Sequence, residues 1–301
     1  MRFGLLGTGY WATEAHGAAL LAHPEAELVA VWGRDPAKAT ALAERLGVRA
    51  CADVDSLLSD VDAVAIALPP DIQADLAVRA AKAGRHLFLD KPLALSTADA
   101  DRVVAAVSAA GVASIVFFTN RFYANVAAFL KDAAAVGDWD GARATVFGSI
   151  FQPGNPFGGS QWRREKGGLW DVGPHALSIV LPVLGPVAAV TAIDGPHDTT
   201  HVLVKHRGGA VTTMALTVDS PVMISSSEYL FYGGAGFAAA PAGDATAVQA
   251  ACWAIGQLMD AVREGRPDHP CDARFGRDVV EILAAADTAR QTGTIQLLPG
   301  S

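Results

Sequence analysis

Three side chains in this sequence are of the types needed for acid–base chemistry on an alcohol. Lys91 directly follows an apolar run that ends at Asp90, and a lysine there can hydrogen-bond a reacting hydroxyl and stabilise its alkoxide character. Asp171 and His175 are four residues apart in the run Gly167–His175, so they share a face if a helix begins here. Because a histidine titrates near neutral pH, it suits removal of an alcohol proton. Asp171 could orient the substrate or the histidine ring.

A structural explanation competes with the catalytic one for each residue. Taken alone, Lys91 also fits a solvated loop lysine, Asp171 a carboxylate near a helix N-terminus, and His175 a histidine packed in the core. A metal site is a weak alternative, because Asp171 and His175 have no third ligand nearby and zinc sites need at least three protein ligands. We therefore expect no bound metal.

A glycine-rich turn near the N-terminus has the spacing of a dinucleotide site. The pattern G-x-G-x-x-A directly follows the strand candidate Arg2–Leu6 and is formed by Gly7-Thr8-Gly9-Tyr10-Trp11-Ala12. Gly7 permits the sharp bend, Gly9 lets the backbone approach a pyrophosphate, and Ala12 lets helix and strand pack closely. The pyrophosphate would bind at the helix N-terminus, where free N–H groups and the helix dipole favour an anion. A plain glycine turn is the alternative, but the place of the pattern between strand and helix favours dinucleotide binding.

The end of the second strand candidate indicates which dinucleotide binds. An NAD site usually has an acid here that holds both ribose hydroxyls, whereas this chain has Gly33 and Arg34, with Lys38 a turn into the next helix. An acid would repel a 2′-phosphate, and a glycine beside cations leaves room for one. NADP is therefore the favoured cofactor. NAD is the alternative, because Arg34 could also stack on adenine or be a surface charge.

Further cofactor contacts are expected where other strands end, because ligands of open α/β sheets gather at the carboxyl ends of their strands. Leu68 and Pro69 stand at the end of one candidate strand, and Asp90 and Lys91 follow another. These four residues complete the predicted cofactor site.

The first 118 residues alternate between short apolar runs and Ala-rich segments, which is typical of a doubly wound parallel sheet covered by helices on both faces. Asp35-Pro36 predicts a helix start, and Ser96 with Asp99 resembles a capping box. The sequence thus predicts an N-terminal Rossmann domain over residues 1–118. Its candidate strands are Arg2–Leu6, Leu28–Trp32, Ala63–Leu68, His86–Leu89 and Ser114–Phe118, and its candidate helices are Ala12–Ala22, Pro36–Leu46, Ile72–Ala83 and Thr97–Ala109.

After Phe118 the pattern changes to strand candidates separated by short turns, which predicts an α/β domain over residues 119–301 with an open, largely antiparallel sheet. We expect a loop at Gln152–Gly168 and a flexible turn at Gly233–Gly243. The candidate strands are Arg143–Phe151, Val187–Ile193, His201–Lys205, Val211–Val218, Glu228–Tyr232 and Thr294–Leu298, and the candidate helices are Phe122–Ala135, Ala247–Arg263 and Phe275–Gln291.

Composition excludes several classes of protein. The net charge is −8 with no basic stripe, so nucleic acid is a poor partner. No stretch approaches the roughly 20 uninterrupted apolar residues of a membrane helix, and the N-terminal residues lack the features of a signal peptide. We expect a cytoplasmic protein without a membrane partner. The three cysteines have no CxxC spacing, which favours reduced thiols.

Taken together and in this order, the motifs resemble the Gfo/Idh/MocA family of oxidoreductases, and the resemblance spans nearly the whole chain. It is carried by Gly7–Ala12, Asp90-Lys91-Pro92, Asn120-Arg121-Phe122, Trp162-Arg163 and Gly167–His175. The resemblance implies a Rossmann domain and an α/β domain whose open sheet often forms a dimer interface. It also implies His175 as acid/base, Lys91 at the substrate oxygen and Asp171 as a substrate contact. The implied substrate site comprises Lys91, Arg121, Trp162, Arg163, Asp171 and His175.

Three positions depart from the family pattern. The family usually has Glu where Asp90 stands, often has His at Gln73, and commonly has Asp at Ser178. These changes affect the expected identity of the substrate more than the expected type of reaction. Members commonly act on sugars, polyols and related cyclic alcohols, and the aromatic residues of this chain leave room for a less polar substrate.

The expected function is hydride transfer between nicotinamide C4 of NAD(P) and a secondary alcohol or carbonyl of a sugar, polyol or related cyclic substrate. Two alternatives share the fold. One is a hydrolase or eliminase with tightly retained NAD, and the other is a dinucleotide sensor without enzyme activity. A pure sensor has no chemical need for Lys91, Asp171 and His175. We expect a homodimer or homotetramer formed through the C-terminal sheet.

Overall fold

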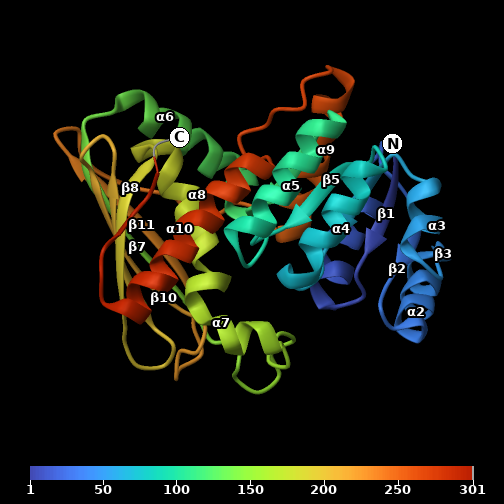
Figure 1. Cartoon of the computed structure of the whole chain (residues 1–301), viewed down its shortest axis with the longest axis horizontal. Coiled ribbons are helices and arrows are strands. Elements are labelled where there is room, and N and C mark those ends of the chain that lie inside the picture. The colour runs from blue at the N-terminus through green and yellow to red at the C-terminus, as the bar shows by residue number, and fades with distance from the viewer. Residues whose placement is uncertain (300–301) are drawn as a thin grey trace. The chain divides into compact units, whose positions relative to one another are not determined.

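The computed structural model describes residues 1–299 and divides into two compact units (Figure 1). The first unit comprises Met1–Thr119 and Ala245–Asp278, and the second comprises Asn120–Asp244 and the chain from Val279 onward. The chain thus passes from the first unit to the second after Thr119, next to the domain boundary expected after residue 118. The segment Ala245–Asp278, expected in the second domain, belongs to the first unit.

The first unit is built on six parallel strands, as its apolar runs predicted. In sheet order they are β3 (Arg49–Ala50), β2 (Glu27–Trp32), β1 (Arg2–Leu6), β4 (Ala63–Ile66), β5 (His86–Asp90) and β6 (Ser114–Phe117). The order changes direction between β1 and β4, and this switch point is where doubly wound sheets bind ligands. All residues of β4 and β6 are buried, as expected of a sheet covered on both faces.

Two helices of the first unit, Pro36–Leu46 and Thr97–Ala110, begin at the capping residues that the sequence indicates. The Asp35 carboxylate accepts hydrogen bonds from the N–H groups of Ala37 and Lys38, and Ser96 Oγ accepts one from the N–H of Asp99 at 3.1 Å. The short β3 and α3 were not predicted. The helices are η1 (Ala12–Gly17, a π-helix), α1 (Ala18–Ala22), α2 (Pro36–Leu46), α3 (Val54–Ser59), α4 (Pro70–Lys82), α5 (Thr97–Ala110), α9 (Ala247–Arg263) and the beginning of α10 (Ala273–Thr292).

Helix α9 explains why the late segment belongs to the first unit. It begins with a capping box between Thr246 and Gln249 and contacts η1, α1 and β6. Cys252 Sγ donates a hydrogen bond to the carbonyl of Ala19 at 3.3 Å. The buried face of α9 includes Ile255 and Leu258, each 0% exposed. Helix α9 therefore contributes to the core of the parallel-sheet unit.

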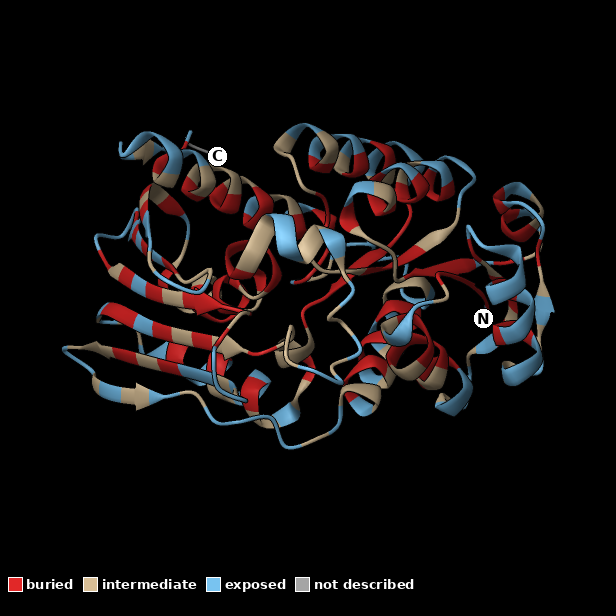
Figure 2. Cartoon of the chain, turned by 90° about the horizontal axis from the view of Figure 1, so that it is seen from below, coloured by how far each residue is buried: buried red, intermediate tan, exposed pale blue. Residues whose placement is uncertain are grey.

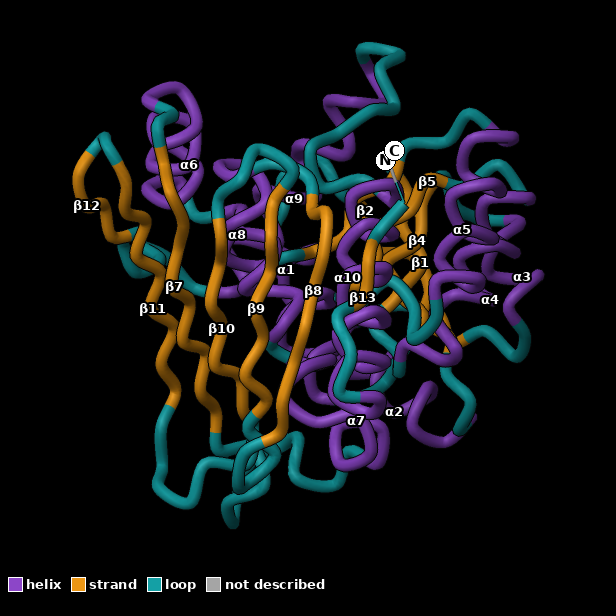
Figure 3. Tube along the Cα trace, turned by 60° about the vertical axis from the view of Figure 1, so that its left-hand side comes forward, coloured by secondary structure: helices purple, strands orange, loops and turns teal. Residues whose placement is uncertain are grey.

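The second unit has an open, mixed and mostly antiparallel sheet of seven strands (Figure 3), which confirms the predicted fold class. Within this second sheet, as far as the structure describes it, β7 and β10 are the only parallel neighbours, and the other strand pairs are antiparallel. In sheet order the strands are β12 (Gly236–Ala239), β11 (Ser225–Gly233), β7 (Trp139–Gly148), β10 (Val211–Thr217), β9 (Thr200–His206), β8 (Val187–Asp194) and β13 (Gln296–Leu297), and the helices are η2 (Thr119–Phe122, which begins at the unit boundary), α6 (Ala124–Val136), α7 (Gln161–Asp171), α8 (Gly173–Leu184) and the rest of α10.

Two segments of this unit differ from the prediction. The loop expected at Gln152–Gly168 ends early, because α7 begins at Gln161. The turn expected at Gly233–Gly243 contains β12, which pairs with β11 at the sheet edge. Both segments carry small or polar residues. Helix α7 depends on partners that are distant in sequence, such as β10, whereas β12 forms a hairpin with the strand that precedes it.

Burial alternates along the strands of this sheet (Figure 2). In β9, Val202 and Val204 are buried, whereas Leu203 between them is exposed. Helices α7 and α8 contact β10. No helix within residues 1–299 is both long and apolar enough to cross a membrane.

Candidate active site

The glycine turn lies at the switch point of the parallel sheet, between β1 and the first helix. Gly7 has φ +134°, and its N–H donates to the carbonyl of Trp32 at 2.9 Å. A Cβ at Gly7 would lie 2.4 Å from the carbonyl oxygen of Ala67, so this position requires glycine. A Cβ at Gly9 would meet no atom within 4 Å. The backbone at Gly9 is therefore open to a ligand, as a pyrophosphate requires.

Two neighbouring residues extend this turn. Ala12 is 1% exposed, and a Cβ at Gly7 would lie 3.2 Å from its Cβ. Ala12 thus fills the space between turn and helix. The side chain of Tyr10, in the first helical turn, is half exposed at 50%.

The residues after β2 lie beside the same turn. A Cβ at Gly33 would approach Thr8 Cγ2 to 2.5 Å, so glycine here makes room for the turn itself. Arg34 is exposed, and Lys38 Nζ lies 3.8 Å from Asp35 Oδ2 on the exposed first turn of α2. The Asp35 carboxylate caps α2 and pairs with Lys38, so the two cations that follow β2 have an acid between them.

The ends of β4 and β5 position the next predicted residues. Leu68 and Pro69 are half-buried, and the carbonyl of Pro69 accepts the N–H groups of Ile72 and Gln73 at the start of α4. Asp90 is the last residue of β5 and Lys91 follows it directly, and both are half-buried. The backbone N–H of Lys91 donates to Asp90 Oδ1 at 2.9 Å, so the Asp90 carboxylate shapes the backbone that presents Lys91.

Gln73 holds the Lys91 segment in place and was noted in the sequence only as a departure from the family pattern. Its side chain is fully buried. Its Nε2 donates to the carbonyls of Asp90, Pro92 and Leu93 at 2.7, 3.1 and 3.3 Å, and its Oε1 accepts the N–H of Asp90 at 2.9 Å. One buried amide thus contacts four backbone groups around Lys91, and its two N–H hydrogens are shared among three carbonyls.

In the second unit, the run Gly167–His175, here named the motif segment, spans the end of α7 and the start of α8. Gly167 has φ +64° and interrupts the helical backbone. A Cβ at Gly168 would lie 2.6 Å from the Cα of Thr217, so the segment packs directly on the backbone of β10. Asp171 is the last residue of α7, His175 lies in the first turn of α8, and Val172 joins the two helices with right-handed helical backbone angles.

Asp171 is buried and paired with a predicted substrate residue. Its Oδ2 accepts a hydrogen bond from Arg163 Nε at 2.9 Å, and the two side chains are 7% and 16% exposed. The Arg163 guanidinium also lies over the rings of Phe157 and Trp162, at 4.7 and 4.6 Å from their centroids. A guanidinium is suited to both contacts, because its plane stacks on rings while its edge binds a carboxylate. The structure therefore brings Trp162, Arg163 and Asp171 together.

His175 lies half-buried in the first turn of α8. Its carbonyl accepts a hydrogen bond from Ser178 Oγ at 2.8 Å, and Arg121 Nη1 donates to the carbonyl of Ser178 at 3.0 Å. Arg121, a predicted substrate residue, thus contacts the backbone one turn after His175. Ser178 is fully buried, and its hydroxyl is used for the hydrogen bond to the helix backbone.

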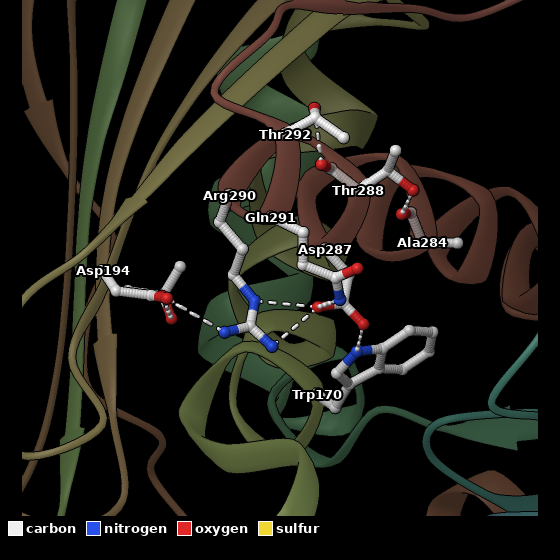
Figure 4. A network of polar contacts seen from close by, with 9 residues as sticks. Trp170, Asp194, Ala284, Asp287, Thr288, Arg290, Gln291 and Thr292 are labelled. Atoms are coloured by element: carbon white, nitrogen blue, oxygen red, sulfur yellow. Dashed lines mark hydrogen bonds and ion pairs between the residues drawn. The ribbon is translucent and has the colours of Figure 1, made fainter.

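A polar network fixes the end of α7 against α10 (Figure 4). Trp170 is 1% exposed, and its Nε1 donates to Asp287 Oδ2 at 3.2 Å. Arg290 pairs with Asp287 at 2.7 Å and with Asp194, at the end of β8, at 3.1 Å. The residue directly before Asp171 is thus tied to another helix and, through Arg290, to the sheet.

The predicted site residues are divided between the units. The first unit holds the glycine turn, Gly33, Arg34, Lys38, Leu68, Pro69, Asp90 and Lys91, and the second holds Arg121, Trp162, Arg163, Asp171 and His175. No group of His, Cys, Asp or Glu side chains within residues 1–299 could hold a metal ion. A parallel sheet with an open glycine turn at its switch point defines a dinucleotide-binding protein of the Rossmann type.

Comparison with known proteins narrows this class. Residues 1–118 match the family described as "Oxidoreductase family, NAD-binding Rossmann fold" (GFO_IDH_MocA). The chain is 29% identical to a dTDP-3,4-didehydro-2,6-dideoxy-alpha-D-glucose 3-reductase of Streptomyces antibioticus, over 78% of this chain and 74% of the relative. It is 40% identical to an inositol 2-dehydrogenase of Rhizobium meliloti (strain 1021), over 40% of this chain and 37% of the relative. The chain belongs to the Gfo/Idh/MocA family and is an oxidoreductase.

Solved structures share the whole fold. GenD2 from gentamicin A biosynthesis, in complex with NAD, has a TM-score of 0.88 at 23% identity and covers 100% of this chain and 97% of its own. Levoglucosan dehydrogenase, in complex with NADH and L-sorbose, has a TM-score of 0.87 at 19% identity and covers 100% and 99%. At these identities the likeness concerns the fold.

Proposed function

We propose that this oxidoreductase transfers hydride between nicotinamide C4 of NAD(P) and a CH–OH carbon of a sugar, polyol or related cyclic substrate. The observation that carries the proposal is His175, an acid/base side chain held at the start of a helix whose backbone Ser178 and Arg121 brace. Relatives that reduce a dTDP-sugar or oxidise inositol support this substrate class. A dinucleotide sensor would need no such group.

The glycine turn and its neighbours are proposed to hold the cofactor. The open backbone at Gly9 fits a pyrophosphate, and the helix that starts at Tyr10 provides N–H donors for an anion. When bound, the cofactor accepts or gives the hydride. Gly7, Thr8, Gly9, Tyr10, Trp11, Ala12, Gly33, Arg34, Lys38, Leu68, Pro69, Asp90 and Lys91 form this proposed site.

The proton steps are assigned to this chain's own side chains. During oxidation His175 takes the hydroxyl proton as hydride leaves the carbon, and during reduction it returns the proton. Lys91 donates a hydrogen bond to the substrate oxygen and stabilises its alkoxide character. Asp171, with Arg163, Trp162 and Arg121, holds the substrate. The Arg163 contact keeps a charged partner beside the buried Asp171 carboxylate.

NADP is proposed as the preferred cofactor. The exposed Arg34 and Lys38 provide two positive charges beside Gly33, where a 2′-phosphate would lie. We also propose that the chain forms a homodimer or homotetramer through the exposed face of its second sheet. Ile193 and Leu203 are apolar residues on this face, and they are 69% and 49% exposed.

The first test combines turnover with one substitution. Purified protein is incubated with NADP+ or NAD+ and with myo-inositol, levoglucosan or D-glucose, and nicotinamide reduction is followed by absorbance. His175→Ala should lower kcat by about 10²- to 10⁴-fold, the range for a positioned acid/base group, and should leave the Kd of NADPH unchanged. The half-buried His23 in the first unit provides the control, and His23→Ala should retain full turnover.

Two other outcomes of this test would contradict the proposed function. If His175→Ala lowers nucleotide affinity as much as turnover, His175 has a structural role. Nucleotide that stays bound through purification, with no net reduction of added NADP+ or NAD+, would identify a hydrolase or eliminase with retained cofactor.

A further inference from the structure

The loop between β8 and β9 carries a carboxylate that belongs to none of the sequence motifs. Asp198 Oδ2 accepts a hydrogen bond from the N–H of Gly168 at 2.7 Å, across 30 residues of sequence. Its Oδ1 accepts from the N–H groups of Val218 and Asp219 at 3.2 and 3.1 Å and from Thr217 Oγ1. One side chain thus joins the end of β10 to the motif segment.

The two carboxylate oxygens have separate tasks. Oδ1 faces three donors at the end of β10, and Oδ2 makes its shortest contact with the N–H of Gly168. Backbone N–H groups at the start of a helical stretch lack partners within the helix, and a carboxylate there is a favoured acceptor. Asp198 provides this acceptor where the backbone resumes its helical course after Gly167.

The loop adopts an unfavourable backbone conformation to bring Asp198 to this position. His197 and Asp198 have φ of +53° and +54°, which is the left-handed region that non-glycine residues rarely occupy. The loop is closed by a hydrogen bond from the Gly195 N–H to the Thr199 carbonyl at 2.7 Å. Thr217 Oγ1 shares its single hydrogen between Asp198 Oδ1 and the His197 carbonyl, which lies 2.7 Å away. Such conformations persist where surrounding contacts over-determine them, and they cluster at functional sites.

The motif segment fits closely against this carboxylate. A Cβ at Gly167 would lie 3.1 Å from Asp198 Oδ2, and a Cβ at Gly168 would lie 2.6 Å from the Cα of Thr217. The glycine pair therefore lets the backbone approach both the carboxylate and β10. Movement of Asp198 would free the segment to shift along β10.

We infer that Asp198 is a positioning residue that fixes the motif segment and thereby the placement of Asp171 and His175. The inference rests on the proposed function, in which these two side chains act on the substrate. Asp171 is three residues after Gly168 and His175 is seven residues after it, so a displaced Gly168 moves both. A displacement of about 1 Å can lower turnover by about 10²-fold.

The decisive variant is Asp198→Asn, which keeps the shape of the side chain but has one carbonyl oxygen. That oxygen is expected to face the three donors at β10, which places the amide NH2 against the N–H of Gly168 and removes the contact to the motif segment. Asp53→Asn is the matched control, because it makes the same change at a carboxylate that accepts a backbone N–H, that of Ser56 at the start of α3, and leaves Gly168 bonded. Asp198→Gly is the second variant, since glycine accepts the positive φ without strain.

Two measurements need no substrate. Amide hydrogen exchange in Asp198→Asn should be faster by about tenfold over residues 168–175, the loss of one hydrogen bond, and unchanged in α9. The NMR signals of the His175 ring in the free protein should shift at constant pH, because the surroundings of the ring change when the motif segment moves. NADPH, used as the probe for the first unit, should bind both variants as tightly as the parent.

The outcomes separate this inference from the proposed function. Unchanged exchange and unchanged His175 ring signals in Asp198→Asn and Asp198→Gly, or equal changes in Asp53→Asn, would overturn the positioning role. If the His175→Ala experiment fails, the catalytic assignment is lost, while the exchange and ring-signal results still decide whether Asp198 holds the segment. With any alcohol that turns over, Asp198→Asn should lower kcat more than it raises KM.

Discussion

His16 is enclosed in the core of the first unit without a hydrogen-bond partner on either ring nitrogen among the described residues. Its ring packs against Phe88 and Phe117, at centroid distances of 4.9 and 5.8 Å. Burial lowers the pKa of His16 from 6.5 to about 3. The folded protein therefore keeps this ring neutral at pH values where the unfolded chain is protonated.

The pH dependence of stability should report this histidine. Between pH 6.5 and about 3 the unfolded state binds a proton at His16 that the folded state does not. The free energy of unfolding should therefore fall as the pH drops below 6.5, by up to about 1.4 kcal/mol per pH unit. Urea unfolding at pH 7.5 and 5.5 measures this slope, and His16→Leu should reduce it. Equal slopes for parent and variant would contradict the assignment.

Arg34 is the residue on which the proposed cofactor preference depends. Arg34→Ala should weaken binding of NADPH more than NADH, by about 1–3 kcal/mol, the range for a hydrogen bond to a charged group. Fluorescence titration with both nucleotides measures the difference. Arg45→Ala, which removes an exposed cation paired with Glu14, should change neither affinity. Equal weakening of both by Arg34→Ala would exclude Arg34 as the selector.

The roles of some residues could be predicted from the sequence, and the roles of others could not. The glycine turn could be predicted because local spacing determines its geometry. Gln73, Asp198 and Asp287 could not be assigned, because their partners are distant in sequence, by 117 residues for Trp170 and Asp287. The sequence indicates that a buried polar side chain needs a partner, but it does not say which backbone group is within reach.

At the scale of elements, the close contact between the motif segment and β10 gives a direct test. Gly168→Ala would place a Cβ 2.6 Å from the Cα of Thr217, so α7 must move or the strand must yield. We expect a loss of about 1–3 kcal/mol in stability, the cost of overpacking, together with reduced turnover. A Cβ at Gly159 would meet no atom within 4 Å, so Gly159→Ala is a matched control that should change neither.

The elements of the first unit could be predicted more fully than those of the second. Apolar runs alternating with capped helices specify a parallel sheet, and the expected strands and helices are present. The two-residue β3 and the short α3 have too few residues for a periodic signal. Most of helix α7 falls within a predicted loop because Gln152–Gly168 is rich in Gly, Pro and polar residues. Contacts with α8, β10 and α10 and the hydrogen bond to Asp198 stabilise the helix.

At the scale of the whole molecule, the exposed sheet face predicts assembly. Leu203→Glu would place a charge on the face proposed to join copies of the chain, and it should shift the protein toward monomer in light scattering coupled to gel filtration. Leu21→Glu introduces the same change on the first unit at a residue of similar exposure, 53% against 49%, and should leave the mass unchanged. A parent protein that is monomeric at micromolar concentration would contradict the proposed assembly.

Because Ala245–Asp278 folds with the first unit, the first unit is encoded by two separate stretches of the gene. This limits how domains can be exchanged between relatives. A fragment that ends at residue 119 lacks α9 and leaves uncovered the surfaces of η1, α1 and β6 that α9 contacts. Exchanging the cofactor-binding half with that of a relative by one genetic crossover would therefore separate α9 from the surfaces it evolved to cover. A functional chimera needs a second crossover near residue 245 and a third within α10. Recombination is therefore less able to separate the two units than it would be if each were one continuous stretch of sequence.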